Sequence, residues 1–332
     1  MSVAAASPAA LAAAKPAPPL AALAGRRPPA PDWFRAALAD APERSELRVQ
    51  GAPVEMLCWG RRGDPGLLLL HGNGAHADWY SFIAPLLKAG RRVVAPSFTG
   101  MGGSGWRTRY SVAQWADEAL AVAEAGGLFE SGELPTVAAH SFGGFPLMNL
   151  AARSGERLAR AVIIDTPLRP PPMVDARRRQ RARDARSARV YPSQAEALVR
   201  FRFLPAQGSE HLFIVDHIAR HGLKQVCGPD NRPGWVWRFD PFLFSHFEFG
   251  QPYADLGRAR CPVVLVRGGR SRLLPAELLA RAQALAPPGT VLMSVDDADH
   301  HVMVDQPLGF AALLDGLAGR ASSDAAAVRS AA

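Results

Sequence analysis

The chain has 332 residues, of which 48% are hydrophobic and 20% charged, so it can form one large folded domain or two average ones. Its net charge of +8 comes almost wholly from arginine, a bias that suggests a GC-rich genome more than a nucleic-acid partner. The three cysteines, Cys58, Cys227 and Cys261, have no CxxC spacing, which argues against a disulfide framework and against a zinc site and favours a reducing compartment.

The N-terminal segment lacks the charged start and apolar centre of a signal peptide. Prolines interrupt it and no basic residue precedes Lys15. No stretch approaches the roughly 18 consecutive apolar residues of a membrane-spanning helix. We therefore expect a soluble, cytoplasmic protein without stable membrane insertion. Residues 1–31 are nearly all Ala, Pro, Leu and Gly, and we expect them, like residues 321–332, to form disordered tails.

Short apolar strands alternate with helices over most of the remaining chain. Residues 46–59 alternate apolar and polar side chains around a turn at Gly51, which indicates a hairpin. Strands are then expected at residues 66–70, 91–96, 136–140, 160–165, 262–267 and 290–295, and helices at 79–87, 112–125, 145–152, 275–285 and 308–317. Unbroken apolar strands in alternation with helices imply a parallel sheet that is covered on both faces.

This alternation stops between Thr166 and about Arg260, in a segment that is too apolar to be a linker. We predict a helical cap at residues 168–260, inserted into a core of residues 32–167 and 261–320. The arginine-rich run at 175–186 is more typical of a solvated helix face than of a site for an anionic partner. Seven aromatic side chains either line an apolar pocket or form the core of the cap: Phe201, Phe203, Phe213, Trp235, Trp237, Phe242 and Phe244.

Residues 136–144, TVAAHSFGG, carry the strongest chemical signal. An apolar strand runs straight into Ser141, which has the small residues Ala139 and Gly143 two positions before and after it, and a helical pattern follows at once. This is the layout of a nucleophile elbow, whose usual pattern is Gly-x-Ser-x-Gly because the tight turn tolerates only small neighbours. An ordinary buried strand with a glycine turn is the alternative.

Several motifs in the same order resemble those of the α/β-hydrolase fold superfamily, in its serine-nucleophile, capped form. The run His71-Gly72-Asn73-Gly74 is similar to the oxyanion loop, residues 100–104 to the loop after the fourth strand, and residues 299–307 to the histidine loop near the C-terminus. The resemblance covers residues 45–318. It implies a mostly parallel sheet of about eight strands with helices on both faces and a helical cap inserted after strand 6.

The resemblance also implies a catalytic triad in the chain order Ser, acid, His. Ser141 would attack a carbonyl carbon after His300 takes its proton, since a serine hydroxyl reacts too weakly without a base. His301 competes with His300 for this role, and the family pattern favours His300. The acid usually follows the strand at 262–267, where this chain has Ser271. Some members of the family instead draw the acid from the end of the preceding strand, which in this chain is Asp165. The resemblance thus leads to the hypothesis that Asp165 orients His300; the alternative is that it caps the next turn.

The remaining expectations concern the oxyanion hole and the reaction. The resemblance places the oxyanion hole at the backbone N–H groups of Asn73 and Phe142, and gives His71 a structural role. We expect a serine hydrolase acting on a small or medium ester or thioester, with no cofactor or metal, no nucleic-acid partner and a small-molecule substrate. Carbon–carbon bond cleavage, acyl transfer and non-catalytic ligand binding stay open as alternatives, as does the oligomeric state.

Overall fold

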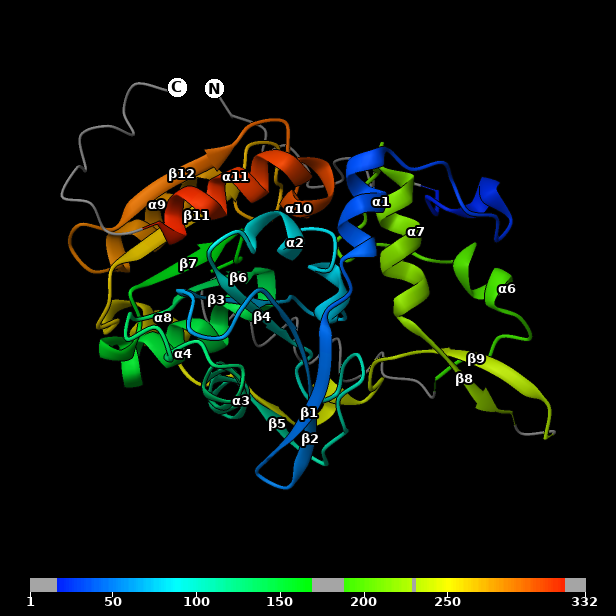
Figure 1. Ribbon diagram of the computed structural model, residues 1–332, viewed down its shortest axis with the longest axis horizontal. Helices are drawn as coiled ribbons and strands as arrows, with labels where there is room; N and C mark the ends of the chain where they lie inside the picture. The colour runs from blue at the N-terminus through cyan, green and yellow to red at the C-terminus, as the bar shows by residue number, and fades with distance from the viewer. Residues whose placement is uncertain (1–16, 169–187, 229–230, 320–332) are drawn as a thin grey trace, which may run out of the picture.

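The computed structural model describes residues 17–168, 188–228 and 231–319, and Figure 1 shows a twisted sheet with helices on both sides. The sheet has eight strands in the order β1-β2-β4-β3-β6-β7-β11-β12. β2 pairs antiparallel with β1 and with β4, whereas all other neighbours are parallel, so the expected α/β-hydrolase architecture is confirmed. The strands are β1 (Glu43–Val49), β2 (Ala52–Trp59), β3 (Gly66–Leu70), β4 (Arg92–Pro96), β6 (Thr136–His140), β7 (Arg160–Ile164), β11 (Val263–Gly268) and β12 (Val291–Val295).

The two faces of the sheet each bury a hydrophobic core, because side chains along a strand alternate between faces. In β6, Ala138 packs into one core, and Val137 and Ala139 pack into the other. The first core is closed by helices that include α2 (Ala84–Leu87) and α11 (Pro307–Ala318). The second is closed by α3 (Val112–Ala125), α4 (Gly144–Ser154), α8 (Pro252–Gly257) and α9 (Ala276–Leu285).

Helix α3 illustrates how the sequence sets a boundary and a buried face. Ser111 caps its start, since its Oγ accepts a hydrogen bond from the Gln114 N–H at 3.0 Å. Trp115, Ala119 and Val122 follow at helical spacing and are buried against the sheet. The side-chain pattern alone therefore predicts both this helix and the face that it buries.

The insertion lies between β7 and β11, and β7 is the sixth strand of the main sheet along the chain. It is not wholly helical, because β8 (Leu223–Cys227) and β9 (Pro233–Trp237) form an antiparallel pair. The aromatic cluster in β9 favours a strand, since aromatic side chains pack well on a pleated surface. Residues 175–186 lie outside the described ranges. The other elements of the insertion are α6 (Gln194–Leu198), α7 (Leu212–His221), η5 (Leu243–His246), β10 (Phe247–Glu248) and α8.

Residues 17–31 differ from the disordered tail that was expected. Leu20 is 1% exposed within the first core, and the carbonyl of Gly25 accepts a hydrogen bond from Arg220 of α7 at 2.8 Å. This burial anchors a segment that has little apolar surface of its own. Residues 1–16 and 321–332 lie outside the described residues. The short elements not yet given are η1 (Ala21–Leu23), α1 (Asp32–Ala39), η2 (Ala77–Trp79), β5 (Tyr110–Ser111), η3 (Ser141–Gly143), η4 (Gly155–Arg157) and α10 (Val302–Asp305).

Across the described ranges, no helix is both long enough and apolar enough to cross a membrane.

Candidate active site

Ser141 lies at the sharp turn between β6 and α4. Its φ is +54°, a conformation that is strained for a residue with a side chain and that is often found at functional sites. Small neighbours make room for the turn. A Cβ on Gly144 would lie 2.1 Å from Oγ1 of Thr166, and one on Gly72 would lie 3.0 Å from Cβ of Ser141. Thr166 also fixes the turn from β7, since its hydroxyl donates to the carbonyl of Ser141 at 2.7 Å.

Ser141, His300 and Asp165 form a continuous chain of hydrogen bonds. Oγ of Ser141 lies 2.8 Å from Nε2 of His300, and Nδ1 of His300 lies 2.6 Å from Oδ2 of Asp165. All three residues are at most 9% exposed. A carboxylate can only accept, so Nδ1 carries the proton and Nε2 presents its lone pair to the serine hydroxyl. This tautomer is the one in which an imidazole can take a proton from serine.

Asp165 is held by one group at the end of β11 and by another on the turn that follows. The Gly268 N–H donates to its Oδ1 at 3.0 Å, and the Ser271 hydroxyl donates to its Oδ2 at 2.5 Å. Ser271 stands where the resemblance leads one to look for a carboxylate. It therefore cannot hold an imidazolium itself, but it supports the carboxylate on the neighbouring strand that contacts His300. Asp165 has a φ of +47° and is completely buried, so its carboxyl group has a fixed position.

The loop that carries His300 is fixed on both sides. The Nε2–H of His140 donates to the His300 carbonyl at 2.8 Å, and burial beside His300 lowers the pKa of His140 well below its usual value. On the other side, Oδ2 of Asp305 accepts from the Asp299 N–H at 2.8 Å. Gln207 of the insertion joins Asp305 to this loop, because its amide nitrogen contacts that carboxylate at 3.0 Å and its Oε1 accepts from the His301 N–H at 3.1 Å.

The loop after β3 brings Gly72 and Asn73 to the same place. His71 orients this loop, since its Nε2 accepts from the Phe98 N–H at 2.9 Å and its Nδ1 then donates to the Gly72 carbonyl at 2.7 Å. Burial lowers the pKa of His71 to about 4, so the ring stays neutral. Phe142 follows Ser141 at the start of η3, where the first N–H groups of a helix have no partner within it.

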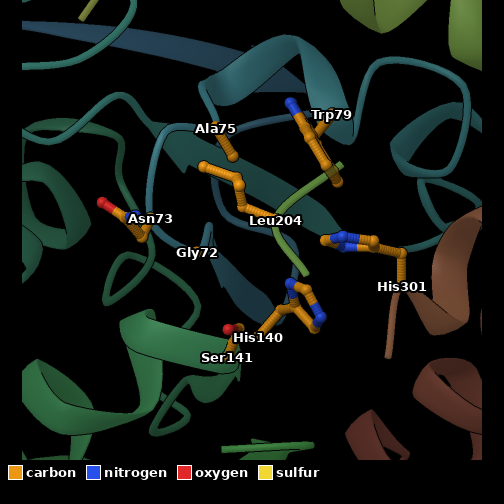
Figure 2. Close-up of a pocket in the computed structure, with 8 residues that line it drawn as sticks. All are labelled: Gly72, Asn73, Ala75, Trp79, His140, Ser141, Leu204 and His301. Atoms are coloured by element: carbon orange, nitrogen blue, oxygen red, sulfur yellow. The ribbon is translucent and has the colours of Figure 1, made fainter. Parts of the chain in front are cut away.

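A small pocket with a cavity volume of about 10 Å³, room for about one water molecule, opens over Ser141 (Figure 2). This volume is below the range of about 300–1,000 Å³ that is typical of sites for drug-sized ligands. Leu204 reaches the pocket from the insertion, and His301 and Trp79 lie across from Ser141. The lining consists of Gly72, Asn73, Ala75, Trp79, His140, Ser141, Leu204 and His301.

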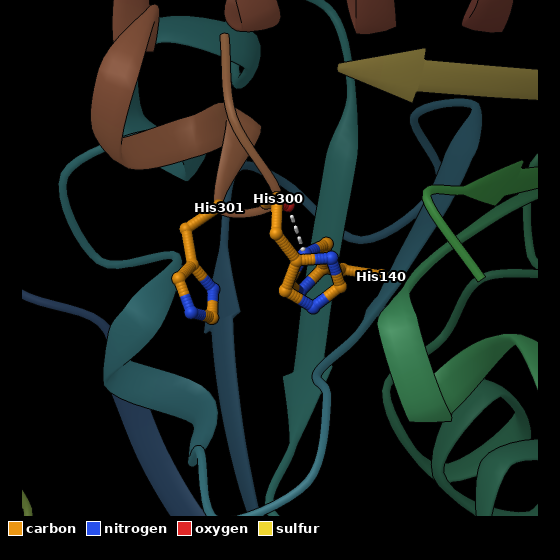
Figure 3. A group of neighbouring side chains, drawn as sticks. All are labelled: His140, His300 and His301. Carbon is orange, nitrogen blue, oxygen red and sulfur yellow. Dashed lines mark hydrogen bonds between the residues drawn. The ribbon is translucent and has the colours of Figure 1, made fainter. Parts of the chain in front are cut away.

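Within the described ranges, two groups of side chains could in principle hold a metal ion. Nitrogens of His140, His300 and His301 lie within 4.8 Å of one another (Figure 3), but both nitrogens of His300 are already engaged by Asp165 and Ser141. A metal would have to displace the serine.

The second group is Asp78 with His217 and His221, with ligand atoms that also lie within 4.8 Å of one another. Arg44 already neutralises this carboxylate, with contacts to both of its oxygens. The geometry of neither group therefore calls for a metal.

The structure thus brings Ser141, His300 and Asp165 into one chain of contacts and places Asn73 and Phe142 beside it. Sequence reasoning did not predict that Ser271 donates a hydrogen bond to Asp165. It could have found this role only by asking which side chains hold an acid that follows the neighbouring strand. It also missed Gln207, for which the sequence carries no signal. The predicted aromatic residues divide between roles: Phe203 packs on Trp79, and Phe244 on Phe142. Phe201, Phe213, Trp235 and Trp237 pack against the first core.

Comparison with known proteins gives one family match and several relatives. The model of the family described as "Alpha/beta hydrolase family" matches residues 67–313. An esterase of Mycobacterium tuberculosis, Rv0045c, is 26% identical over 275 residues, which are 81% of this chain and 88% of the esterase. A pimeloyl-[acyl-carrier protein] methyl ester esterase of Aromatoleum aromaticum is 35% identical over 105 residues, or 31% of this chain and 37% of that enzyme.

Solved structures agree at the level of the fold. One structure of the M. tuberculosis esterase has a TM-score of 0.68 at 22% identity and covers 87% of this chain and 99% of its own. A thioesterase domain from the curacin biosynthetic pathway has a TM-score of 0.66 at 20% identity, over 84% of this chain and 99% of that domain. At such identities the likeness shows the fold alone.

Proposed function

Because the chain belongs to the alpha/beta hydrolase family, we propose that it is a serine hydrolase that cleaves a small or medium ester or thioester through an acyl-enzyme on Ser141. The observation that carries the proposal is the chain of hydrogen bonds from Ser141 through His300 to Asp165 beside a pocket. Two relatives that are named esterases support the substrate class. The intact chain of contacts weighs against a member that only binds a ligand.

In the proposed first half of the reaction, Ser141 Oγ attacks the carbonyl carbon while its proton moves to Nε2 of His300. Negative charge then develops on the former carbonyl oxygen. The backbone N–H groups of Asn73 and Phe142 stabilise it, at about 2.7–4 kcal/mol for each such donor. His300 returns the proton to the leaving alcohol or thiol, and the acyl group stays on Ser141.

In the second half, water replaces the leaving group. His300 takes a proton from the water, hydroxide adds to the acyl carbon, and the acid leaves as the proton returns to Ser141 Oγ. Asp165 stays ionised and stabilises the positive imidazolium in both halves. The small size of the pocket favours short acyl groups.

A panel of p-nitrophenyl esters and acyl thioesters of graded chain length tests the proposal. We expect hydrolysis by the wild-type protein and a loss of at least about 10⁴-fold in kcat/KM in Ser141→Ala. Ser131→Ala is the matched control, since Ser131 makes only a local turn contact before β6 and should leave turnover unchanged. Equal turnover by Ser141→Ala and wild type would exclude Ser141 as the nucleophile.

A further inference from the structure

His301 is a buried imidazole with unused hydrogen-bonding capacity at the pocket. It is 4% exposed, and neither Nδ1 nor Nε2 has a hydrogen-bond partner in the described part of the chain. The backbone of Pro205 acts on its pKa, but the contact falls outside hydrogen-bonding geometry. Native proteins pair nearly all of their buried polar groups, so an unpaired ring at a ligand pocket points to a partner that arrives with the ligand.

The ring of His301 is held in place rather than free to turn to solvent. Its centroid lies 4.6 Å from that of Phe203, 5.3 Å from that of Trp79 and 4.8 Å from that of His300. Its backbone N–H is fixed by Gln207. Figure 2 shows the ring of His301, the residue before α10, reaching toward the space between Trp79 and Ser141. A side chain fixed in this way is preorganised, so a ligand that pairs with it loses little entropy in ordering the site.

The chemistry of the ring limits what it can bind. Burial is the main cause that lowers the pKa of His301 well below its usual value, and the neighbouring His300 and His140 rings add to the effect. The ring is therefore neutral at neutral pH and offers one donor and one acceptor. Among the residues that the structure describes, no lysine or arginine lines the pocket, so a carboxylate there would lack a counter-charge from them. An uncharged hydroxyl or amide group fits both properties.

We propose that His301 is the polar anchor of a substrate subsite and selects short esters that carry a hydroxyl or amide group near the scissile bond. The proposal rests on the proposed hydrolase activity. The distance between the anchor and the reacting serine is short, because the His301 ring packs on His300, whose Nε2 contacts Ser141. Both His301 and Ser141 also line the same small pocket. The polar group can belong to the acyl part or to the alcohol part, and the test separates the two.

Two matched ester pairs test the proposal. Methyl 3-hydroxybutanoate and methyl 3-methylbutanoate differ by a hydroxyl against a methyl group on the acyl side. Hydroxyethyl butanoate and propyl butanoate differ in the same way on the alcohol side. With hydrolysis followed by proton release, we expect the wild-type protein to prefer the hydroxyl member of one pair by about tenfold in kcat/KM, because the apolar member leaves the imidazole unpaired.

Variants at His301 assign the preference to this ring. In His301→Phe the ratio within the preferred pair falls to about one, whereas His301→Gln, which keeps a donor and an acceptor, retains part of it. The ratio compares two esters on the same protein, so a general loss of activity does not imitate the result. Binding of all four esters to Ser141→Ala, measured by calorimetry, repeats the comparison with His301 intact and should show tighter binding of the same hydroxyl ester.

The outcomes distinguish this proposal from the one on which it rests. Wild-type hydrolysis with no preference in either pair would overturn the role of His301 but leave the hydrolase intact. A preference that persists in His301→Phe would assign the selectivity elsewhere. Failure of folded wild-type protein to hydrolyse any ester or to react with a fluorophosphonate would overturn the proposed hydrolase, and the subsite with it.

Discussion

Replacing Asp165 by asparagine should prevent His300 from acting as a base, because it changes which ring nitrogen of His300 carries the proton. The Gly268 N–H is a fixed donor to Oδ1, so the asparagine oxygen must stay at that position and its NH₂ group must take the place of Oδ2. The Ser271 hydroxyl can rotate to accept from this NH₂ group. His300 cannot keep a proton on Nδ1 against another donor, so it shifts the proton to Nε2 and can no longer accept one from Ser141.

The expected loss in kcat/KM for Asp165→Asn is about 10⁴-fold, the effect of the wrong tautomer in a serine triad. Ser271→Ala is the matched variant, because it removes a hydrogen bond to the same carboxylate without changing the tautomer. A hydrogen bond to a charged group contributes about 1.5 kcal/mol or more, which corresponds to a loss of about tenfold. Steady-state hydrolysis of a p-nitrophenyl ester measures both, with thermal unfolding to show that each variant is folded.

A folded Asp165→Asn protein that keeps kcat/KM within tenfold of wild type would refute this reasoning and remove Asp165 from the site. A loss in Ser271→Ala as large as that in Asp165→Asn would show that the tautomer argument is wrong.

Two further predictions concern stability. Gly144→Ala should destabilise the fold by about 1–3 kcal/mol, because the new Cβ would lie 2.1 Å from Thr166 Oγ1. The control Gly316→Ala, in α11, places its Cβ where no atom lies within 4 Å and should stabilise the fold by about 0.5–1 kcal/mol. Denaturant unfolding measures both changes, and equal effects of the two variants would contradict the prediction. Burial lowers the pKa of His217 to about 3, so the unfolded chain binds a proton that the folded one does not as pH falls below about 6.5. The contribution of this group to the free energy of unfolding should therefore fall by about 1 kcal/mol between about pH 6.5 and 5.5. His217→Gln should reduce the dependence of the unfolding free energy on pH, whereas the exposed control His246→Gln should leave it unchanged. An unchanged pH dependence in His217→Gln would refute the assignment.

The arrangement of Ser141 and Asp165 follows from features that a sequence displays. In the parallel pairing of β6 with β7, His140 lies opposite Ile164, so the residues that follow each strand emerge side by side at one edge of the sheet. Strand ends are visible as apolar runs, so the sequence predicts which residues follow each strand at this edge, whereas the roles of Ser141 and Asp165 came from the resemblance to the family.

The rest of the site depends on contacts that no local pattern encodes. Gln207 contacts Asp305 from the insertion, whose sequence has no hydrophobic periodicity that would predict its fold. The β8–β9 pair was not predicted, because the aromatic run was interpreted as part of a helical cap. Ser271 was considered only as a replacement for the acid, and a hydroxyl cannot stabilise an imidazolium. Its hydrogen bond to Asp165 was not predicted, because the two residues are 106 positions apart in the chain. All three features depend on tertiary contacts, because the role of each residue is set by what packs against it.

Fluorophosphonate labelling, detected as the intact mass of the protein, tests the central claim most directly. A serine reacts with this reagent at a useful rate only when a neighbouring base activates it. We predict one adduct on the wild-type protein, none on Ser141→Ala, and slow labelling of His300→Ala. Folded wild-type protein that takes up no adduct, or an adduct that persists in Ser141→Ala, would contradict the account.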